Sequence, residues 1–178
     1  RASVLKGKLE LLLGNYKAAL KAFKRIEDQD VDYIAEVLDD IKACYFELGK
    51  KNDFKQYLSK ISHGSAGYPA ILMLVDIIYH EEGELIALEF LSEQLKQQPS
   101  LVGLERYILL EQETAKGKEA DVLMILRGLV KSLMKGVKNY HCDQCGFAGK
   151  TLHWQCPGCK SWSTIKLKQD FEVSDARP

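Results

Sequence analysis

Residues 140–159 read YHCDQCGFAGKTLHWQCPGC and contain two CxxC turns, formed by Cys142, Cys145, Cys156 and Cys159. Ten residues separate the second of these cysteines from the third. Two CxxC turns at this spacing can bring four thiolates to the corners of a tetrahedron around one metal ion. The segment is too short to bury an adequate apolar core, and a structural metal contributes about 10–16 kcal/mol in comparable zinc peptides. The stretch therefore predicts a small module folded around one metal ion.

Four thiolates bind either iron or zinc, so the spacing leaves the identity of the metal open. Two disulfides in a secreted module are the alternative. We disfavour them because no signal peptide precedes the cysteines and because neighbouring cysteines in CxxC turns usually chelate. The remaining cysteine, Cys44, lies in an apolar helical pattern with Ile41, Tyr45 and Leu48, which predicts a small core residue.

Upstream of the cysteines, four glycines recur at spacings of 35, 34 and 34 residues: Gly14, Gly49, Gly83 and Gly117. Each glycine follows one amphipathic stretch and precedes another, so each is predicted to form the turn between two antiparallel helices. A period of 34 residues is typical of the tetratricopeptide repeat, whose hairpins stack into a solenoid.

Residues 9–23 read LELLLGNYKAALKAF and resemble this repeat closely. The resemblance places Gly7 and Ala19 at the small contact positions of the two helices and Phe23 at an apolar packing position. The later units match more loosely, and we expect Leu85 and Met124 to occupy apolar positions in them. Such a solenoid has a concave groove, lined mainly by the first helix of each hairpin, in which we expect a protein to bind. Sequence alone does not identify the groove residues.

The chain opens inside a helical pattern without an initiator methionine, so we expect it to be a fragment of a longer protein. We assign residues 1–135 to about four helical hairpins, of which the first could be truncated, residues 136–168 to the metal module, and residues 169–178 to a flexible tail. Because the linker at residues 136–139 is very short, we expect the module to dock against the last hairpin.

Around the cysteines the sequence resembles rubredoxin, with Tyr140 two residues before the first cysteine, a CxxCG turn followed by Phe147, and a W-x-C-P-x-C turn beginning at Trp154. The segment between the turns is shorter than in electron-carrier rubredoxins, and Lys160 replaces the second glycine. A lysine with positive φ costs about 1 kcal/mol, unless the turn adopts a different shape. We expect the three aromatic residues named above and Trp162 to form a small core. The alternative is that one tryptophan is an exposed anchor for a partner.

The net charge of the whole chain is zero, which argues against general polyanion binding. The charge is unevenly spread, with a net of −4 over residues 1–130 and +6 over residues 131–168. The basic segment raises the alternative of a nucleic-acid-binding zinc ribbon. It lacks the dense basic residues interleaved with exposed aromatics that such surfaces carry, so we expect no nucleic acid as partner. No GxSxG, phosphate-loop or HExxH motif is present, and we expect the chain not to be an enzyme.

Helical hairpins that lead directly into residues 151–165, TLHWQCPGCKSWSTI, resemble the lipopolysaccharide assembly protein B family of Gram-negative bacteria over the whole chain. The resemblance implies a non-enzymatic adaptor that promotes degradation of the lipid A pathway deacetylase LpxC by the membrane-bound ATP-dependent protease FtsH. It implies that the four cysteines bind one metal ion and that the module packs against the repeats.

The same resemblance implies further partners and a location. The partners are FtsH, the deacetylase and other lipopolysaccharide assembly proteins, and self-association is compatible with it. An upstream membrane anchor, absent from this stretch, would hold the repeats at the cytoplasmic face of the bacterial inner membrane. A rubredoxin-type iron electron carrier is the alternative function.

Overall fold

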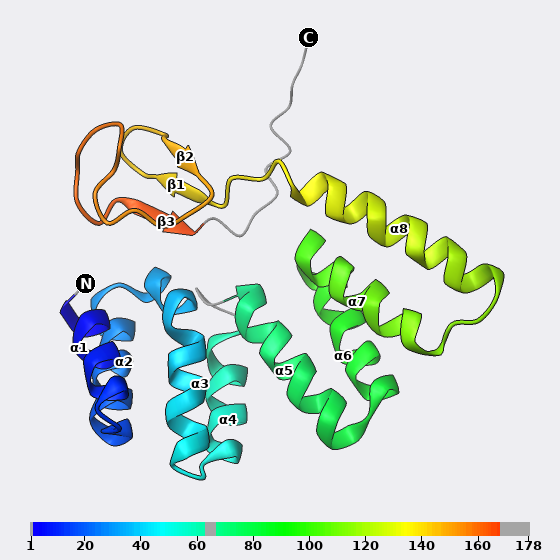
Figure 1. The fold of residues 1–178 in the computed structure, drawn as a ribbon, viewed down its shortest axis with the longest axis horizontal. Helices are drawn as coiled ribbons and strands as arrows, with labels where there is room; N and C mark the ends of the chain where they lie inside the picture. Colours follow the sequence, from blue (N-terminus) through cyan, green and yellow to red (C-terminus); the bar gives the residue numbers. More distant parts are fainter. Residues whose placement is uncertain (1, 63–66, 168–178) are drawn as a thin grey trace.

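The computed structural model describes residues 2–62 and 67–167, and most of them are helical (Figure 1). Eight α-helices in these ranges form four consecutive hairpins: α1 Ala2–Leu12, α2 Tyr16–Gln29, α3 Leu38–Glu47, α4 Lys51–Ile61, α5 Gly67–Glu82, α6 Glu84–Gln97, α7 Leu101–Thr114 and α8 Lys118–Met134. A small module with short strands follows them. The predicted fold class, a helical-repeat solenoid with a small rubredoxin-like module, is confirmed. The tail expected at residues 169–178 lies outside the described residues.

The four predicted turn glycines separate the two helices of each hairpin. Gly14, Gly49, Gly83 and Gly117 all have positive φ angles, between 60° and 98°. A residue with a side chain adopts this left-handed conformation only at a free-energy cost. At Gly49 the backbone N–H donates to the Phe46 carbonyl at 3.0 Å, which closes the end of α3. The recurring glycines are therefore helix-terminating turns, as predicted.

Packing within the first hairpin follows the repeat pattern. Ala19 and Phe23 are fully buried on α2. A Cβ added to Gly7 on α1 would collide with the Phe23 ring, so only glycine permits this approach of the two helices. Cys44 on α3 is also fully buried, which confirms its prediction as a core residue. The same core continues through Leu58 on α4 and joins the first two hairpins.

Two apolar positions expected to pack are instead exposed. Leu85 lies in the first turn of α6, beside the Gly83 turn, and is 77% exposed. Met124 on α8 is 62% exposed. Helix α8 packs extensively against α7, and no other described helix makes a comparably extensive contact with it. Both predictions were wrong because a repeat consensus position is buried only where a neighbouring helix covers it.

Between the first two hairpins the chain forms two short 3-10 helices, η1 Val31–Tyr33 and η2 Ala35–Val37. Tyr33, Ile34 and Val37 are buried there. In Figure 1 this connection lies at the end of the first hairpins that faces the C-terminal module. None of the described helices combines the length and hydropathy needed to cross a bilayer.

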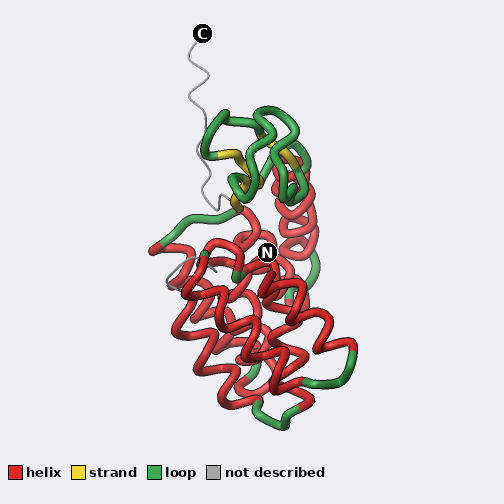
Figure 2. The backbone as a smooth tube through the Cα atoms, turned by 90° about the vertical axis from the view of Figure 1, so that its left-hand side faces the viewer, coloured by secondary structure: helices red, strands yellow, loops and turns green. Residues whose placement is uncertain are grey.

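The module contains a three-stranded antiparallel sheet in the order β2-β1-β3. Its strands are β1 Tyr140–Cys142, β2 Ala148–Gly149 and β3 Ile165–Leu167. Tyr140 of β1 lies opposite Gly149 on one side and Leu167 on the other. Figure 2 shows the strands and loops of the module gathered at one end of the helical stack.

Candidate metal centre

The two CxxC turns have matching backbone geometry. In the first turn, the Gly146 N–H donates to the Cys142 carbonyl at 3.0 Å and the Cys142 N–H donates to the Phe147 carbonyl at 2.8 Å. In the second turn, the Lys160 N–H donates to the Cys156 carbonyl at 3.0 Å and the Cys156 N–H donates to the Ser161 carbonyl at 2.9 Å. Each turn therefore holds its two cysteines on one side of a tight loop.

The loops bring the four sulfur atoms together. The Sγ atoms of Cys142, Cys145, Cys156 and Cys159 all lie within 4.8 Å of one another. Across the turns, Cys142 Sγ lies 3.8 Å from Cys159 Sγ, and Cys145 Sγ lies 3.6 Å from Cys156 Sγ. A tetrahedron with zinc–sulfur bonds of about 2.3 Å has edges of about 3.8 Å. The four cysteines are thus positioned to bind one metal ion.

The disulfide alternative does not hold, because all five cysteines are free. Imidazole ligands are also absent from the cluster. His141 Nε2 lies 2.6 Å from the Lys138 carbonyl oxygen, and the His153 ring packs edge-on against Phe147. Among the described residues, the four thiols are the only cluster of metal-ligand side chains found, and they complete a tetrahedral shell.

The surroundings of two thiols favour the thiolate that a metal requires. A hydrogen bond with the Thr164 hydroxyl, 3.3 Å from Cys142 Sγ, and the N–H groups of Cys145 and Gln144 lower the pKa of Cys142 to about 6. The hydroxyl and N–H of Ser161 lower the pKa of Cys159. Such hydrogen bonds stabilise the charged form of the sulfur.

Cys145 differs from these two thiols. The Phe147 N–H favours its thiolate, but partial desolvation of the sulfur and the neighbouring thiols outweigh that bond and raise the pKa of Cys145 to about 11. Four thiols gathered without a cation cannot all ionise, since each new charge repels the others. A divalent ion among them would remove that repulsion and release protons on binding.

Three residues that support the sulfurs were missed from the sequence. Ser161 and Thr164 contact the thiols as described above. A Cβ at Gly158 would lie 3.2 Å from Cys145 Sγ, so a larger residue there would crowd the cluster. The signal that could have found the two hydroxyl residues is the SWST stretch that follows the second turn at residues 161–164.

The aromatic core expected beneath the site is only partly correct. The buried centre of the module consists of Cys142, Cys156 and Ile165, against which Tyr140 and Phe147 pack together with Leu152. Trp154 is not part of this cluster, and Trp162 is 58% exposed. The few residues of the module enclose only a small core, which leaves no room for either indole.

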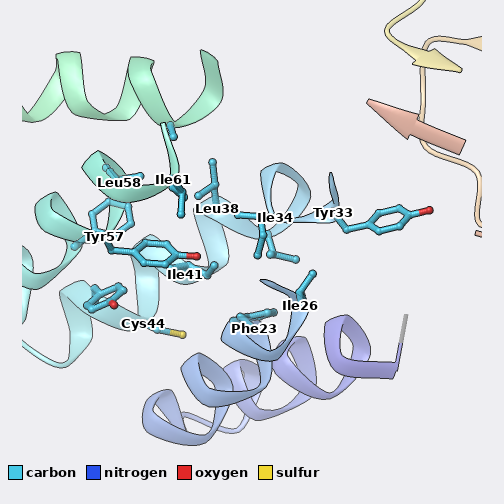
Figure 3. Packing of buried hydrophobic residues seen from close by; sticks show 14 of the residues in the cluster. Phe23, Ile26, Tyr33, Ile34, Leu38, Ile41, Cys44, Tyr57, Leu58 and Ile61 are labelled. Atoms are coloured by element: carbon cyan, nitrogen blue, oxygen red, sulfur yellow. The ribbon is translucent and has the colours of Figure 1, made fainter. Parts of the chain in front are cut away.

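Trp154 instead faces the helical hairpins. Its indole stacks on the Tyr33 ring with centroids 5.1 Å apart and an interplanar angle of 24°. The Tyr33 hydroxyl donates to the Ile165 carbonyl of β3 at 3.0 Å, in a buried position. In Figure 3 the Tyr33 side chain points away from Phe23 and Ile26 and toward the strands. Burial raises the pKa of Tyr33, so its hydroxyl stays protonated as a donor.

Two polar contacts extend this interface. The Tyr140 hydroxyl donates to Glu36 Oε1 at 2.6 Å, and burial together with this carboxylate raises the pKa of Tyr140. Lys166 Nζ donates to Asp32 Oδ2 at 2.6 Å and lies 3.4 Å from Asp30 Oδ1. The segment 30–37 and the module residues that contact it are together called the clamp. The prediction that the module docks against the last hairpin is wrong, because the clamp holds it on the connection between the first two.

Comparison with known proteins supports these assignments. A family described as "Rubredoxin metal binding domain" matches residues 140–166. The lipopolysaccharide assembly protein B of Escherichia coli K12 is 34% identical over 169 residues, which is 93% of this chain and 43% of that protein. The protein of the same name from Haemophilus influenzae is 31% identical over 167 residues, which is 93% of this chain and 42% of that protein. The chain is a homologue of lipopolysaccharide assembly protein B.

The homology extends over both parts of the architecture, the helical hairpins and the cysteine module. The match covers the hairpins as well as the cysteine module, so the two parts occur together in the relatives. The chain spans less than half of the length of the lipopolysaccharide assembly B proteins that it matches.

Proposed function

We propose that this chain is part of a non-enzymatic adaptor that regulates lipopolysaccharide synthesis, and that the C-terminal module forms a cap on its helical hairpins. The observation that carries the proposal is the match to relatives named lipopolysaccharide assembly protein B across both the hairpins and the cysteine module. A stacked row of hairpins offers a large binding surface for other proteins. The chain would act in the assembly of lipopolysaccharide at the cytoplasmic face of the inner membrane, held there by a segment upstream of it.

The metal would have a structural role. We propose that Cys142, Cys145, Cys156 and Cys159 bind one ion, zinc or iron, with residues 136–168 folded around it as a unit and residues 1–135 forming the hairpins. A four-sulfur shell leaves no open position for substrate, which is typical of structural sites. The bound ion would supply folding free energy to the module. The clamp would then transmit that rigidity to the hairpins.

The partners would be a protease and its substrate. We infer that the hairpins bring the lipid A pathway deacetylase, LpxC, to the membrane-bound protease FtsH, together with other lipopolysaccharide assembly proteins. Presenting a substrate needs a rigid surface and no chemistry of its own, which suits stacked hairpins closed by a metal cap.

A test in cells follows from this role. In a strain that depends on the full-length protein, Cys142→Ser with Cys145→Ser should lengthen the half-life of the deacetylase severalfold after protein synthesis is stopped. Cys44→Ala, which removes a thiol outside the site, serves as the matched control and should leave the half-life unchanged. Equal deacetylase turnover with and without the gene would refute the adaptor role.

One observation favours a second function, that of an iron electron carrier. Cys145 and Cys159 are exposed, and a sulfur near the surface gives an electron a short route to a partner. A red protein with a reversible one-electron wave would support this function. A colourless protein that contains stoichiometric zinc would eliminate it.

A further inference from the structure

A cavity of about 500 Å³ opens on the first two hairpins, far in sequence from the four clustered cysteines. One wall is α2, which contributes Lys17, Lys21, Lys24 and Arg25. The rest of the lining comes from the end of α3, the turn to α4 and the first turn of α4. The second helix of the first hairpin therefore forms most of this site, whereas we expected binding along the first helices.

The basic side chains of this wall lack charge partners. The four cations follow one another at intervals of four, three and one residues along α2, and all are exposed. None of them has a carboxylate oxygen within 4.0 Å among the described residues, where ten other such ion pairs occur. Lys24 Nζ instead lies 5.4 Å from the ring centres of Tyr45 and Tyr57. The cations therefore remain available to an outside anion.

Acidic residues at the site do not cancel this charge. Two aspartates line the cavity, and one of them, Asp53, lies 3.5 Å from a fifth cation, Lys50. Asp28 is the other. Five basic and two acidic side chains leave the lining with a net charge of +3, in a chain whose net charge is zero. A concentration of one charge in a concave site attracts ligands of the opposite sign.

The floor of the cavity is apolar. Tyr45 is only 4% exposed, and Leu20 and Leu48 are half-buried. The volume is large enough for several side chains, within the usual range of roughly 300–1,000 Å³ for ligand sites. From Lys17 to Arg25 the helix rises about 12 Å, which is the length of about four residues of an extended peptide. The site thus combines a basic row with an apolar base over the length of a short peptide.

We propose that this cavity binds an acidic peptide segment of a partner protein. Carboxylates of the segment would pair with the lysines and Arg25, while an apolar side chain between them would enter the cavity onto Leu20 and Leu48. A compact anion such as phosphate would be held by converging donors, often at a helix N-terminus, rather than by side chains spread over two turns of a helix. The inference rests on the proposed adaptor function for its biological meaning.

The test uses the purified metal-loaded chain and a fluorescent peptide of about ten residues that alternates glutamate with leucine. Fluorescence anisotropy should show saturable binding at about 50 mM salt that weakens at least fivefold at about 200 mM salt, because exposed charges are screened. The double variant Lys21→Glu, Arg25→Glu should weaken binding at least tenfold. Leu48→Ser should weaken it less than the charge reversal but measurably.

Matched controls separate the site from general charge effects. The double variant Lys96→Glu, Lys116→Glu changes the net charge equally at exposed positions outside the cavity and should bind within twofold of the parent. A peptide with serine in place of leucine should bind more weakly than the parent peptide. The proposed site would be overturned if both double variants weakened peptide binding equally. It would also be overturned if the serine-containing peptide bound as tightly as the parent peptide.

Two further arms examine other anions. Inorganic phosphate at about 10 mM and phosphatidylglycerol vesicles should neither compete with the peptide nor bind in a manner sensitive to Lys21→Glu, Arg25→Glu. Binding of either one with that sensitivity, together with no peptide binding, would overturn the proposal in favour of that anion. This assay involves no deacetylase turnover, so its failure would leave the proposed adaptor role to be judged by its own test.

Discussion

Lys160 occupies the same place in the second CxxC turn that Gly146 occupies in the first. Their φ angles are 62° and 70°, and each N–H donates to the carbonyl of the first cysteine in its turn at 3.0 Å. The sequence left two outcomes for this lysine, a strained backbone or a turn of different shape. The matching hydrogen bonds show that the shape is kept, so the strain is present at Lys160.

We therefore expect Lys160→Gly to stabilise the module by up to about 1 kcal/mol, because glycine relieves a left-handed conformation. The gain is reduced by the greater freedom of glycine in the unfolded chain. Competition with a chelator should show tighter metal binding, by up to about fivefold.

Lys138→Gly provides the control for this change. Lys138 is an exposed lysine of the same module, and it is not among the residues with positive φ. Glycine should weaken metal binding there or leave it unchanged. Equal effects of the two glycines would show that the backbone at Lys160 is not strained.

At the scale of elements, the connection at residues 30–37 has an unexpected role. It forms two short 3-10 helices rather than a plain turn, and these carry Tyr33 and Glu36 toward the module. Tyr33 is buried among residues of the hairpin core and also stacks on Trp154. One side chain thus belongs to two packing units, which makes this connection the joint between them.

Replacing Tyr33 should loosen this joint in two steps. Tyr33→Phe removes the donor to the buried Ile165 carbonyl and should cost about 1–3 kcal/mol, because an unsatisfied buried carbonyl remains. Tyr33→Ala also removes the stack on Trp154 and should cost about 3–5 kcal/mol. Chemical denaturation gives the free energies, and Trp154 fluorescence should shift to the red as the indole meets water.

Tyr79→Phe is the matched control, because the Tyr79 hydroxyl donates to Glu113 at 2.5 Å in an exposed position. Its loss should leave the stability nearly unchanged, because solvent water can replace an exposed hydrogen bond. If Tyr33→Ala left both stability and Trp154 emission unchanged, the clamp would not hold the module.

At the scale of the whole molecule, the chain returns on itself. The module follows α8 in sequence, yet Lys166 pairs with Asp30 and Asp32 near the start of the chain. At the end of the fourth hairpin, the Lys135 carbonyl accepts a hydrogen bond from Lys150 Nζ of the module at 3.0 Å. The cap therefore joins the last hairpin to the first two, and metal binding should be felt at a distance from the cysteines.

Removing the metal should release the segment at residues 30–37 more than the helix that leads into the module. Without the ion, the four thiols repel once ionised and the small core of the module is insufficient. Hydrogen exchange should show at least tenfold less protection of the Tyr33 and Ile34 amides after chelation. Protection across residues 118–134 should change by less than twofold, and adding zinc back should restore the parent pattern. Greater loss in residues 118–134 than in residues 30–37 would contradict the clamp.

The features that could be predicted from sequence depend on residues close together in the chain. The CxxC spacing specifies the sulfur cluster, and Gly14, Gly49, Gly83 and Gly117 specify the helix turns, because turns and helical faces follow short-range periodicity. These patterns were sufficient for the fold class and for four thiols placed to bind a metal. Even here, the supporting hydroxyls of Ser161 and Thr164 were missed, since hydroxyl residues are common in loops.

Only the tertiary structure decided where the cap sits. Tyr33 and Ile165 meet across 132 positions of sequence, and neither carries a local pattern that names the other. The position of the cap depends on the angles at which successive helices pack, and small rotations at each hairpin add up along the row. The apolar floor beneath the basic row of α2 arises in the same way, because Tyr45 and Leu48 come from the next hairpin. Local chemistry made the cysteine cluster and the turns, whereas the accumulated geometry of the hairpins brought distant surfaces into contact.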